Sequence, residues 1–487
     1  MSTHPMTPQI LEWFDRISAI PRCSKDEARI IAWLEQWAAD NGFACRKDHV
    51  GNLAISVPGS EGCQGAPIVV LQGHMDMVCE KTPESTHDFA TDPIVPAADG
   101  EWLTAEGTTL GADNGIAMAM AMVAALATDL VHPPLELLFT VDEETGLTGA
   151  NALEPGFIEG RLLINIDSED EGVITVGCAG GIDTMLYLPL ELADAPAGWS
   201  TVQVLAGGMS GGHSGVDIHL QRANAIRVLA RALTTLSDEL DLAIADLTGG
   251  SAHNAIPRDA GAVLCVRPEQ RQALETRLGE VAAVIQTEFA NTDPKLFLAV
   301  RDADAPAPRV LSPASAVRAL DFIMAVPHGV AAMSTDIDGL VETSNNEATL
   351  AIEDGRLALQ SSQRSSVVSR LQAHTRRIEG LARLAGGHAE SGNGYPPWQP
   401  DMDSELLASA KRIYTGLFGK DPVVEVIHAG LECGIIGDRT PGMDMISIGP
   451  TIRNPHSPDE MLHIPTIGMV WDFLAAILAE IASRPAA

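Results

Sequence analysis

The segment IVVLQGHMD, residues 68–76, is an apolar run that ends in a histidine and an aspartate. In two later segments an apolar run likewise ends in acidic residues: LELLFTVDEE at residues 135–144 and LLINID at residues 162–167. Between the first two lies GIAMAMAMVAAL, residues 115–126, which is apolar on every side and therefore predicts a buried helix. Short apolar strands that alternate with such a helix predict an α/β fold with a mostly parallel sheet covered by helices.

A different pattern begins near residue 184 and ends near residue 390. Strand-like segments stand there beside two long helical segments, residues 224–236 and 268–290. This arrangement is typical of an α+β domain. We therefore expect an inserted α+β domain at residues 184–390, within a discontinuous α/β domain formed by residues 1–183 and 391–487.

The chain is strongly acidic. Its 487 residues include 31 Lys plus Arg and 65 Asp plus Glu, which gives a formal net charge of −34 at pH 7. Such a surface repels phosphate backbones and anionic lipids, so we expect no nucleic acid and no membrane as a partner. Hydrophobic residues make up 46% of the chain, which is a globular composition. Small molecules or metal cations fit this charge better.

The cysteines and the N-terminus bear on the compartment. The seven cysteines are scattered and form no Cys-x-x-Cys pair, which predicts reduced thiols rather than a disulfide framework or a thiolate zinc cluster. The N-terminus lacks a basic segment followed by an apolar one, so no secretory signal is expected. The longest uncharged apolar stretch, residues 115–128, is too short to span a bilayer. We expect a soluble, cytoplasmic protein.

Side chains that can bind metal follow several of the predicted strands. Ligands in open α/β sheets bind beyond the carboxyl ends of the strands, so these side chains should meet at one sheet edge. One more acidic residue stands directly before the apolar helix, where an aspartate can also serve as a helix cap. The candidates are His74, Asp76, Asp113, Glu143, Glu144, Asp167 and His456.

Any one of these acidic residues alone would be interpreted as a solvated loop charge. Together they bring several like charges to one place, which requires cations, and sets of histidine and carboxylate suit zinc or related divalent metals. A two-metal hydrolytic centre, with ions about 3.5 to 4 Å apart that share one carboxylate, explains the whole set.

One rival motif is Gly208-Met209-Ser210-Gly211-Gly212, which matches the Gly-x-Ser-x-Gly turn of serine hydrolases. In a glycine-rich stretch the match is weak, and a serine hydrolase would leave the acidic loops unexplained. The sequence contains neither a phosphate-binding loop nor a dinucleotide-binding fingerprint. The glycines of residues 177–181 have the wrong spacing for a dinucleotide site.

At these residues the sequence resembles the co-catalytic zinc peptidases of the aminoacylase and carboxypeptidase G superfamily. More narrowly, it resembles the aminoacyl-histidine dipeptidases, also called peptidase D or cytosol non-specific dipeptidases. The resemblance implies that the α/β domain is a catalytic di-metal domain and that the inserted domain is a lid. The segments that carry it are QGHMDMV (72–78), GTTLGADNG (107–115), DEETGLTGA (142–150), NIDSEDEG (165–172), GCAGGID (177–183), GGHSGVDIH (211–219), HNAIPR (253–258), VETSNN (341–346), IHAGLECG (427–434) and SIGPTIRNPHSPDE (447–460).

The resemblance also implies a role for each candidate ligand. Asp113 would bridge two metal ions, with Glu144 and His456 on one ion and His74 and Asp167 on the other. Each ion would thus be held by histidine and carboxylate donors, which agrees with the chemistry expected from the residue types.

Two further acidic residues would act beside the ions. Asp76 would hydrogen-bond the imidazole of His74 and fix its tautomer. Glu143 would be the general base, because a water acidified by two cations needs a nearby carboxylate to take its proton and pass it to the leaving amine.

In the inserted domain, the resemblance implies that His213 helps to polarise the scissile carbonyl. It also implies that Asn254 and Arg364 bind the substrate. A guanidinium suits the free α-carboxylate of a dipeptide because its two N–H groups can reach both oxygens.

The implied function is a metal-dependent dipeptidase that hydrolyses unblocked dipeptides, of the Xaa-His type and including β-alanyl-His, by a water activated by two metal ions. Zn²⁺ is the expected metal, with Mn²⁺ and Co²⁺ left open, and a homodimer is also left open. One alternative is a related aminoacylase or amide hydrolase of the same superfamily. Another is a non-catalytic metal-binding relative, in which a base or ligand would be lost.

Overall fold

The computed structural model describes residues 4–335 and 337–484, and the chain forms two compact units. The first unit comprises Met1–Cys178, Trp398–Val426 and Leu431–Ala487, and the second comprises Ala179–Pro397 and Ile427–Gly430. The boundaries therefore lie at 178/179 and 397/398, where the sequence suggested 183/184 and 390/391. The cause is that β9 (Gly180–Pro189) and β19 (His388–Tyr395) pair with each other and so belong to one sheet.

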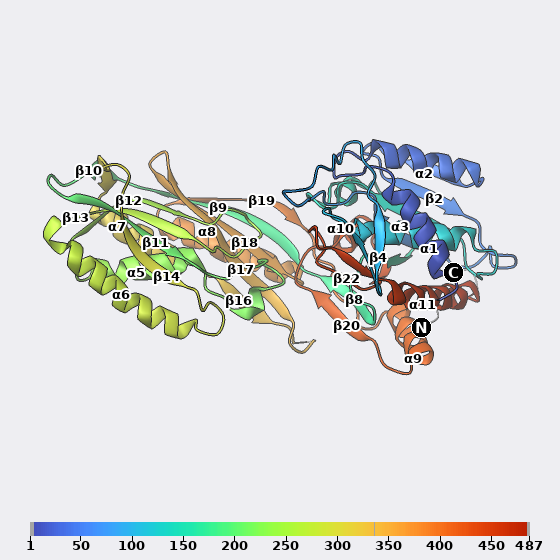
Figure 1. Ribbon diagram of the computed structural model, residues 1–487. Helices are drawn as coiled ribbons and strands as arrows, with labels where there is room; N and C mark the ends of the chain where they lie inside the picture. Colours follow the sequence, from blue (N-terminus) through green and yellow to red (C-terminus); the bar gives the residue numbers. More distant parts are fainter. Residues whose placement is uncertain (1–3, 336, 485–487) are drawn as a thin grey trace. The chain divides into compact units, whose positions relative to one another are not determined.

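Some strands of the main sheet of the first unit are labelled in Figure 1. In spatial order its strands are β1 (Ala44–Lys47), β2 (Leu53–Val57), β6 (Leu135–Thr140), β3 (Val69–His74), β7 (Leu162–Asn165), β21 (Asp444–Ser447), β8 (Val173–Cys178) and β20 (Val423–Ile427). The central strands β6, β3, β7 and β21 are parallel, whereas β1, β2 and β8 pair antiparallel with their neighbours. Every residue of β3 and β6 is buried, as expected for parallel strands covered on both faces. The predicted α/β class is confirmed, with antiparallel strands added at the edges.

Helices and a smaller sheet complete the first unit. Helix α3 packs on β3 and on α1, and for this reason it is apolar on all sides. The helices are α1 (Thr7–Ser18), α2 (Ala28–Asp40), α3 (Ala112–Leu126), α4 (Thr148–Ala152), α9 (Glu405–Phe418), α10 (Glu432–Arg439) and α11 (Ile464–Ala482). The smaller sheet has the order β22 (Ile452–Arg453), β23 (Met461–His463), β5 (Trp102–Ala105) and β4 (Pro96–Asp99).

The register of the parallel strands determines which loops meet. His74, the last residue of β3, pairs with Thr140 at the end of β6. Gln72 pairs with Asn165 at the end of β7, and Asn165 in turn pairs with Ser447 at the end of β21. The loops that follow these four strands therefore leave the sheet at the same edge.

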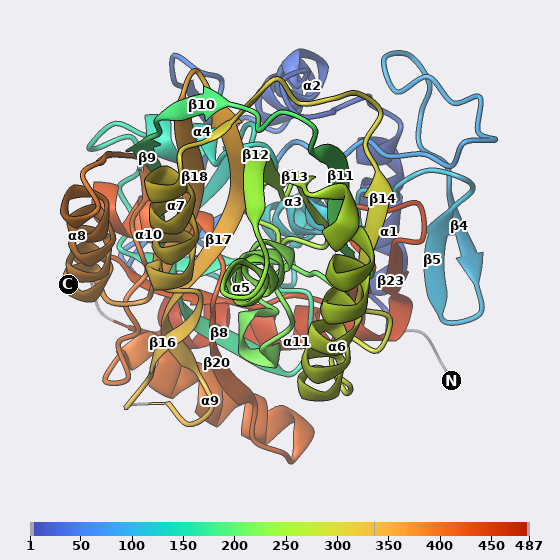
Figure 2. The same ribbon diagram turned by 90° about the vertical axis from the view of Figure 1, so that its left-hand side faces the viewer.

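The second unit is built on an antiparallel sheet. In spatial order its strands are β14 (Phe297–Asp302), β11 (Ser200–Gly207), β13 (Ala260–Val266), β12 (Leu242–Gly249), β17 (Val341–Glu353), β18 (Arg356–Ser365), β9 and β19, with β16 (Gly329–Met333) on β17. Figure 2 shows α5 (Ala225–Ser237), α6 (Arg271–Glu288) and α7 (Pro313–Ala325) in front of these strands, and α8 (Val368–Leu384) at the left. Leucine, isoleucine and valine side chains from the helices and the sheet form the buried core between them.

Short elements connect these strands and helices. A two-stranded ribbon pairs β10 (Leu192–Asp194) with β15 (Arg309–Leu311), and single 3₁₀ turns occur at Ile218–Leu220 and Pro268–Gln270. Helices α5 and α6 lie within two or three residues of the helical segments that the sequence predicts. Helices α7 and α8 were not predicted.

Helix α11 is long and apolar enough to cross a membrane by length and composition. Of its most apolar window, however, 56% is buried inside the structure, and the helix packs on α1 and α9. A buried helix of this kind is a core element of the first unit. Its apolar character follows from that packing.

The prediction that the cysteines are reduced is wrong for one pair. Cys23 and Cys79 form a disulfide, with their Cα atoms 5.7 Å apart. Cys23 forms a parallel β-bridge with Met77, which brings together two segments that are 56 residues apart in the sequence. Spacing could not reveal this pair, because the contact depends on the fold and not on a local motif.

Candidate metal centre

The predicted metal ligands converge at the edge of the main sheet. His74 Nε2 lies 3.0 Å from Asp113 Oδ1 and 3.6 Å from Asp167 Oδ1. His456 Nε2 lies 3.1 Å from Asp113 Oδ2 and 3.0 Å from Glu144 Oε2. The two oxygens of Asp113 thus face two different groups, each made of one histidine and one further carboxylate. A carboxylate shared between two ions needs this arrangement.

The electrostatics of the cluster reflect this pairing of opposite charges. Burial acts to raise the pKa of Asp113, but hydrogen bonds from His456 and His74 hold it well below its usual value. The hydrogen bonds with Asp113 and Glu144 raise the pKa of His456 to about 11. Burial raises the pKa of Asp167 well above its usual value, and the negative charge of Asp113 adds to the rise. Protons on the two imidazoles offset the carboxylate charges here, and divalent cations would do the same once those protons leave.

The residues present fit a divalent metal. His74, Asp113 and Glu144 offer ligand atoms that all lie within 4.8 Å of one another. Glu144 Oε1 is buried and has no hydrogen-bond partner among residues 4–335 and 337–484, so one ligand oxygen is available. The side chain of His456 is 50% exposed, which leaves the cluster accessible to ions. Imidazole and carboxylate donors are the ligands of zinc and related metals.

Asp76 organises the site from a fully buried position. The Nδ1 atom of His74 lies 3.1 Å from the backbone oxygen of Asp76 and 3.3 Å from its Oδ1. The Asp76 carboxylate also accepts hydrogen bonds from the N–H groups of Glu143 (3.1 Å) and Glu144 (3.2 Å) and from Ser24 Oγ (2.8 Å). Burial acts to raise the pKa of Asp76, but the contacts with His74, Ser24 and Glu143 outweigh it and lower this pKa to about 2. Asp76 therefore orients His74 and also fixes the turn that carries both glutamates.

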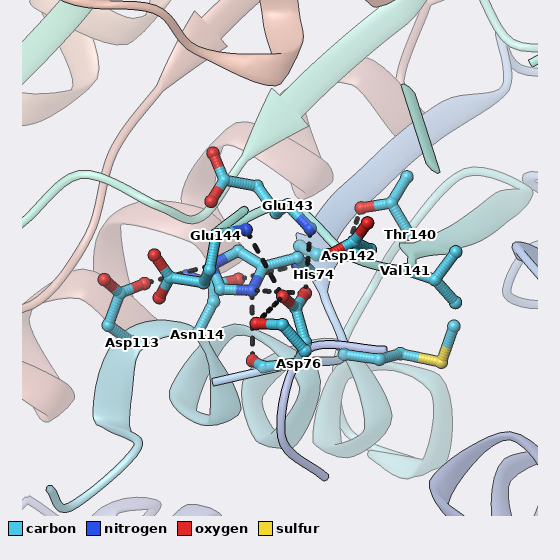
Figure 3. Close-up of polar contacts among 12 residues, drawn as sticks. His74, Asp76, Asp113, Asn114, Thr140, Val141, Asp142, Glu143 and Glu144 are labelled. Carbon is cyan, nitrogen blue, oxygen red and sulfur yellow. Dashed lines mark hydrogen bonds and ion pairs between the residues drawn. The ribbon is translucent and has the colours of Figure 1, made fainter. Parts of the chain in front are cut away.

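Glu143 and Glu144 are adjacent, yet their carboxylates point in different directions, and only that of Glu144 faces Asp113 (Figure 3). The preceding Asp142 has a left-handed backbone with φ of 48° and accepts hydrogen bonds from Thr145 Oγ1 and Thr148 Oγ1, both at 2.5 Å. These contacts hold the turn. Burial raises the pKa of Glu143 well above its usual value, and the nearby carboxylates add to the rise. Cations among these carboxylates would lower it again.

The second unit brings together the residues expected to bind substrate. His213 forms an antiparallel bridge with Ala255, and the N–H of Ser214 donates to the backbone oxygen of Asn254 at 2.8 Å. Arg364 Nη2 lies 3.4 Å from Ser214 Oγ. His213, Asn254 and Arg364 therefore form one local group within this unit.

His213 has a defined protonation state. Its Nδ1 accepts hydrogen bonds from the N–H groups of Gly215 (3.2 Å) and Val216 (3.0 Å), so the proton of the neutral ring must be on Nε2. Burial, together with the charge of Arg364, lowers the pKa of His213 to about 4. At pH 7 the ring is neutral and its Nε2–H can donate a hydrogen bond.

Arg364 is a buried guanidinium that is only 6% exposed. Its Nη1 donates to Tyr395 Oη at 2.5 Å, and the neighbour of Nη2 is the hydroxyl of Ser214. Its Nε is buried and has no hydrogen-bond partner in the described part of the chain. A buried cation whose hydrogen-bond partners are neutral hydroxyls is suited to receive an anion.

The rival serine motif is not arranged for nucleophilic attack. Ser210 Oγ donates to the backbone oxygen of Thr292 at 2.7 Å, and the Ser210 N–H donates to Asp293 Oδ1. A nucleophilic serine instead donates to a base that takes its proton. The acidic cluster of the first unit is therefore the better candidate site.

Comparison with known proteins identifies the family. The sequence profile of peptidase family M20/M25/M40 matches residues 70–480. The chain belongs to this family. It is 40% identical over 480 residues to the cytosol non-specific dipeptidase of Escherichia coli (strain K12), which covers 98% of this chain and 99% of that protein.

Two solved structures show the same fold. The crystal structure of aminoacylhistidine dipeptidase from Vibrio alginolyticus superimposes with a TM-score of 0.87 and 39% identity, covering 98% of this chain and 97% of that one. Aminopeptidase PepT from Bacillus cereus ATCC 10987 has a TM-score of 0.56 at 16% identity, covering 98% and 99%, and so shares the fold. The resemblance inferred from the sequence motifs is confirmed.

Sequence reasoning missed two buried residues, Arg22 and Glu460, that hold the backbone of the loops at the candidate site. Arg22 is almost fully buried, and its guanidinium donates to the backbone oxygens of Met75, Asp76 and Gly111. Its sequence neighbourhood gives no signal of this role. Glu460 accepts hydrogen bonds from the backbone N–H groups of residues 110–113. It is the last residue of the motif at residues 447–460, and this motif was the one available sequence signal for it.

Proposed function

We propose that this M20 family member is a metal-dependent dipeptidase that hydrolyses unblocked dipeptides. The observation that carries the proposal is the geometry of Asp113, whose two oxygens face two separate groups of histidine and carboxylate. The names of its relatives support the proposed reaction, since proteins 39% and 40% identical to it over nearly their whole length are named as dipeptidases.

The metal centre of the proposed enzyme would hold two divalent ions. His74 and Asp167 would bind one ion, Glu144 and His456 would bind the other, and Asp113 would bind both. Zn²⁺ is the proposed metal because the donors are imidazole and carboxylate, with Mn²⁺ and Co²⁺ as the other ions that suit this set. The unpartnered Glu144 Oε1 supports a ligand role for Glu144.

Glu143 and Asp76 have separate proposed roles beside the ions. When bound, two divalent cations would supply Lewis acidity, lowering the pKa of the attacking water and polarising the scissile carbonyl. Glu143 takes the proton of the attacking water and passes it to the leaving amine, and it is free to do so because Glu144 provides the ligand. Asp76 contacts the His74 ring and accepts from the N–H groups of both glutamates, and thereby fixes the positions of these three residues relative to one another.

The second unit is proposed to recognise the substrate. Nε2–H of His213 donates to the oxygen of the scissile carbonyl, where negative charge develops. Asn254 and Arg364 bind the dipeptide, with the guanidinium on the free α-carboxylate. The support is the neutral surroundings of the buried Arg364 and the local group it forms with His213 and Asn254.

The proposed substrates are small dipeptides, of the Xaa-His type and including β-alanyl-His. The name aminoacylhistidine dipeptidase of the Vibrio alginolyticus relative supports histidine in the second position. The word cytosol in the name of the Escherichia coli relative supports a cytoplasmic location. A homodimer is a further proposal, which sedimentation of the purified protein would check.

Amidation of the dipeptide C-terminus is expected to lower kcat/KM by about 10- to 100-fold, because it removes a charge-assisted hydrogen bond to Arg364. Arg364→Ala should erase most of this difference, whereas Arg370→Ala, which alters an exposed arginine paired with Glu342, should preserve it. The measurement is hydrolysis of matched free and amidated dipeptides by metal-reconstituted protein.

The same assay separates the alternatives. Equal turnover of free and amidated dipeptides by the wild type would exclude the carboxylate clamp. Faster cleavage of N-acetylated amino acids than of any dipeptide would favour an aminoacylase. Absence of hydrolysis by fully metal-loaded protein would indicate a non-catalytic relative.

A further inference from the structure

Glu460 lies between β22 and β23 and is only 2% exposed. Its carboxylate accepts hydrogen bonds from four consecutive backbone N–H groups. Oε2 accepts from Leu110 at 2.8 Å and Gly111 at 2.9 Å, and Oε1 accepts from Ala112 at 2.8 Å and Asp113 at 3.3 Å. One side chain thus fixes the whole backbone segment that ends in the proposed bridging aspartate.

The opposite side of this segment is also held. Arg22 Nη2 donates to the backbone oxygen of Gly111 at 2.5 Å, while Nη1 of the same guanidinium donates to Asp76 O at 2.8 Å. Gly111 has a φ of +69°, and a Cβ at this position would lie 2.7 Å from Arg22 Nη2. The peptide groups of Gly111 are therefore clamped between a buried carboxylate and a buried guanidinium.

We propose that Glu460 is a positioning residue of the metal centre, which holds the backbone of residues 110–113 so that the Asp113 carboxylate stands between the two ion sites. Glu460 is also four residues after His456, so the same short loop supplies a ligand of one ion and the support for the shared ligand. The inference rests on the proposed two-metal function and adds a residue to it that touches neither ion.

The chemistry of the contact predicts which substitutions break it. Each carboxylate oxygen of Glu460 accepts two N–H groups. A glutamine has the same shape but only one acceptor oxygen, so in either orientation its NH₂ group would face two N–H donors. Glu460→Asp keeps the negative charge but is one methylene shorter, and so can retain only part of the contact.

Glu136 provides a matched control. It is also a buried glutamate, 3% exposed, and its Oε2 accepts from the N–H groups of Glu159 and Gly160, both at 2.7 Å. It is near the start of β6, away from the carboxyl edge of the sheet. Glu136→Gln therefore loses a comparable buried contact without touching the metal loops.

The experiment uses metal-free, full-length protein in four forms: wild type, Glu460→Gln, Glu460→Asp and Glu136→Gln. Hydrogen exchange of the amides at residues 110–113 reports the contact itself, and competitive titration with Zn²⁺ against a chromophoric chelator reports its consequence. We expect faster exchange and a Zn²⁺ affinity lowered by about 10- to 100-fold in Glu460→Gln. Glu460→Asp should lie between this variant and the wild type, and Glu136→Gln should bind Zn²⁺ like the wild type.

Two outcomes would overturn the inference while leaving the proposed function intact. One is wild-type Zn²⁺ affinity in Glu460→Gln despite faster exchange at residues 110–113. The other is an equal loss of affinity in Glu136→Gln, which would assign the effect to general destabilisation. If Glu460→Gln does not fold, Glu460→Asp decides between the same outcomes. Failure of the wild type to bind Zn²⁺ would instead overturn the proposed function, and the inference with it.

Discussion

Replacing Glu143 by Gln is expected to lower kcat by about 10²- to 10⁴-fold while both metal ions stay bound. An amide cannot accept the proton that must leave the attacking water. The metal content should persist because the contacts of the cluster with His456 use Glu144, and the carboxylate of Glu143 points elsewhere. Single-turnover hydrolysis of a dipeptide, with metal analysis of the same sample, measures both quantities.

Glu144→Gln is the matched comparison, since the two residues are neighbours in one turn. This variant should lose metal affinity first and activity as a consequence, so that added Zn²⁺ restores part of the rate. Added Zn²⁺ should restore nothing in Glu143→Gln. If both variants showed the same metal loss and the same residual rate, the division of roles between base and ligand would be wrong.

Asp113→Asn is expected to weaken binding of both ions and to lower kcat/KM by at least about 10³-fold, since the loss of metal removes several kcal/mol of transition-state stabilisation. The reason is that the two oxygens of Asp113 serve two separate groups. Zn²⁺ titration of the metal-free variant, followed by elemental analysis, measures the effect.

Asp170→Asn is the control for Asp113→Asn, because Asp170 is a half-exposed carboxylate on a neighbouring loop that pairs with Arg453. It should bind metal like the wild type. If Asp113→Asn loses only one ion and keeps the other at wild-type affinity, Asp113 is a ligand of a single site and does not bridge.

The convergence of the proposed ligands was predictable because it follows from strand direction. His74, Glu144 and Asp167 stand at or just after the ends of buried apolar strands, and parallel strands place their ends at one edge. The antiparallel strands β1 and β2 were not predicted as such, since an apolar run does not reveal its direction.

The supports of the site could not be predicted in the same way. Glu460 contacts Gly111 across 349 residues, and Arg22 contacts it across 89 residues, so no local pattern marks either one. The disulfide between Cys23 and Cys79 depends on the same kind of long-range contact. Such residues are recognised only when the structure shows which buried polar groups they satisfy.

Strand β17 shows a second reason for missed elements. Its first residues, VETSNN at 341–346, are polar and do not resemble a core strand, yet all of them are buried. Their side chains are used in hydrogen bonds: Asn345 accepts from Ser361 and Gln363, and Asn346 donates to Ala255 O. A polar strand is tolerated in a core only when its groups are paired in this way, and the pairing is invisible in the sequence.

The central claim is that two ions share Asp113 and that dipeptide hydrolysis depends on both. Metal-free protein titrated with Zn²⁺ tests it directly, with bound metal and dipeptide hydrolysis measured on the same samples and the ions located by anomalous scattering from crystals. The account predicts two ions per chain, one on each side of the Asp113 carboxylate, with full activity only when both are bound. Full activity with a single ion, and with Glu144 or Asp167 turned to solvent, would contradict it.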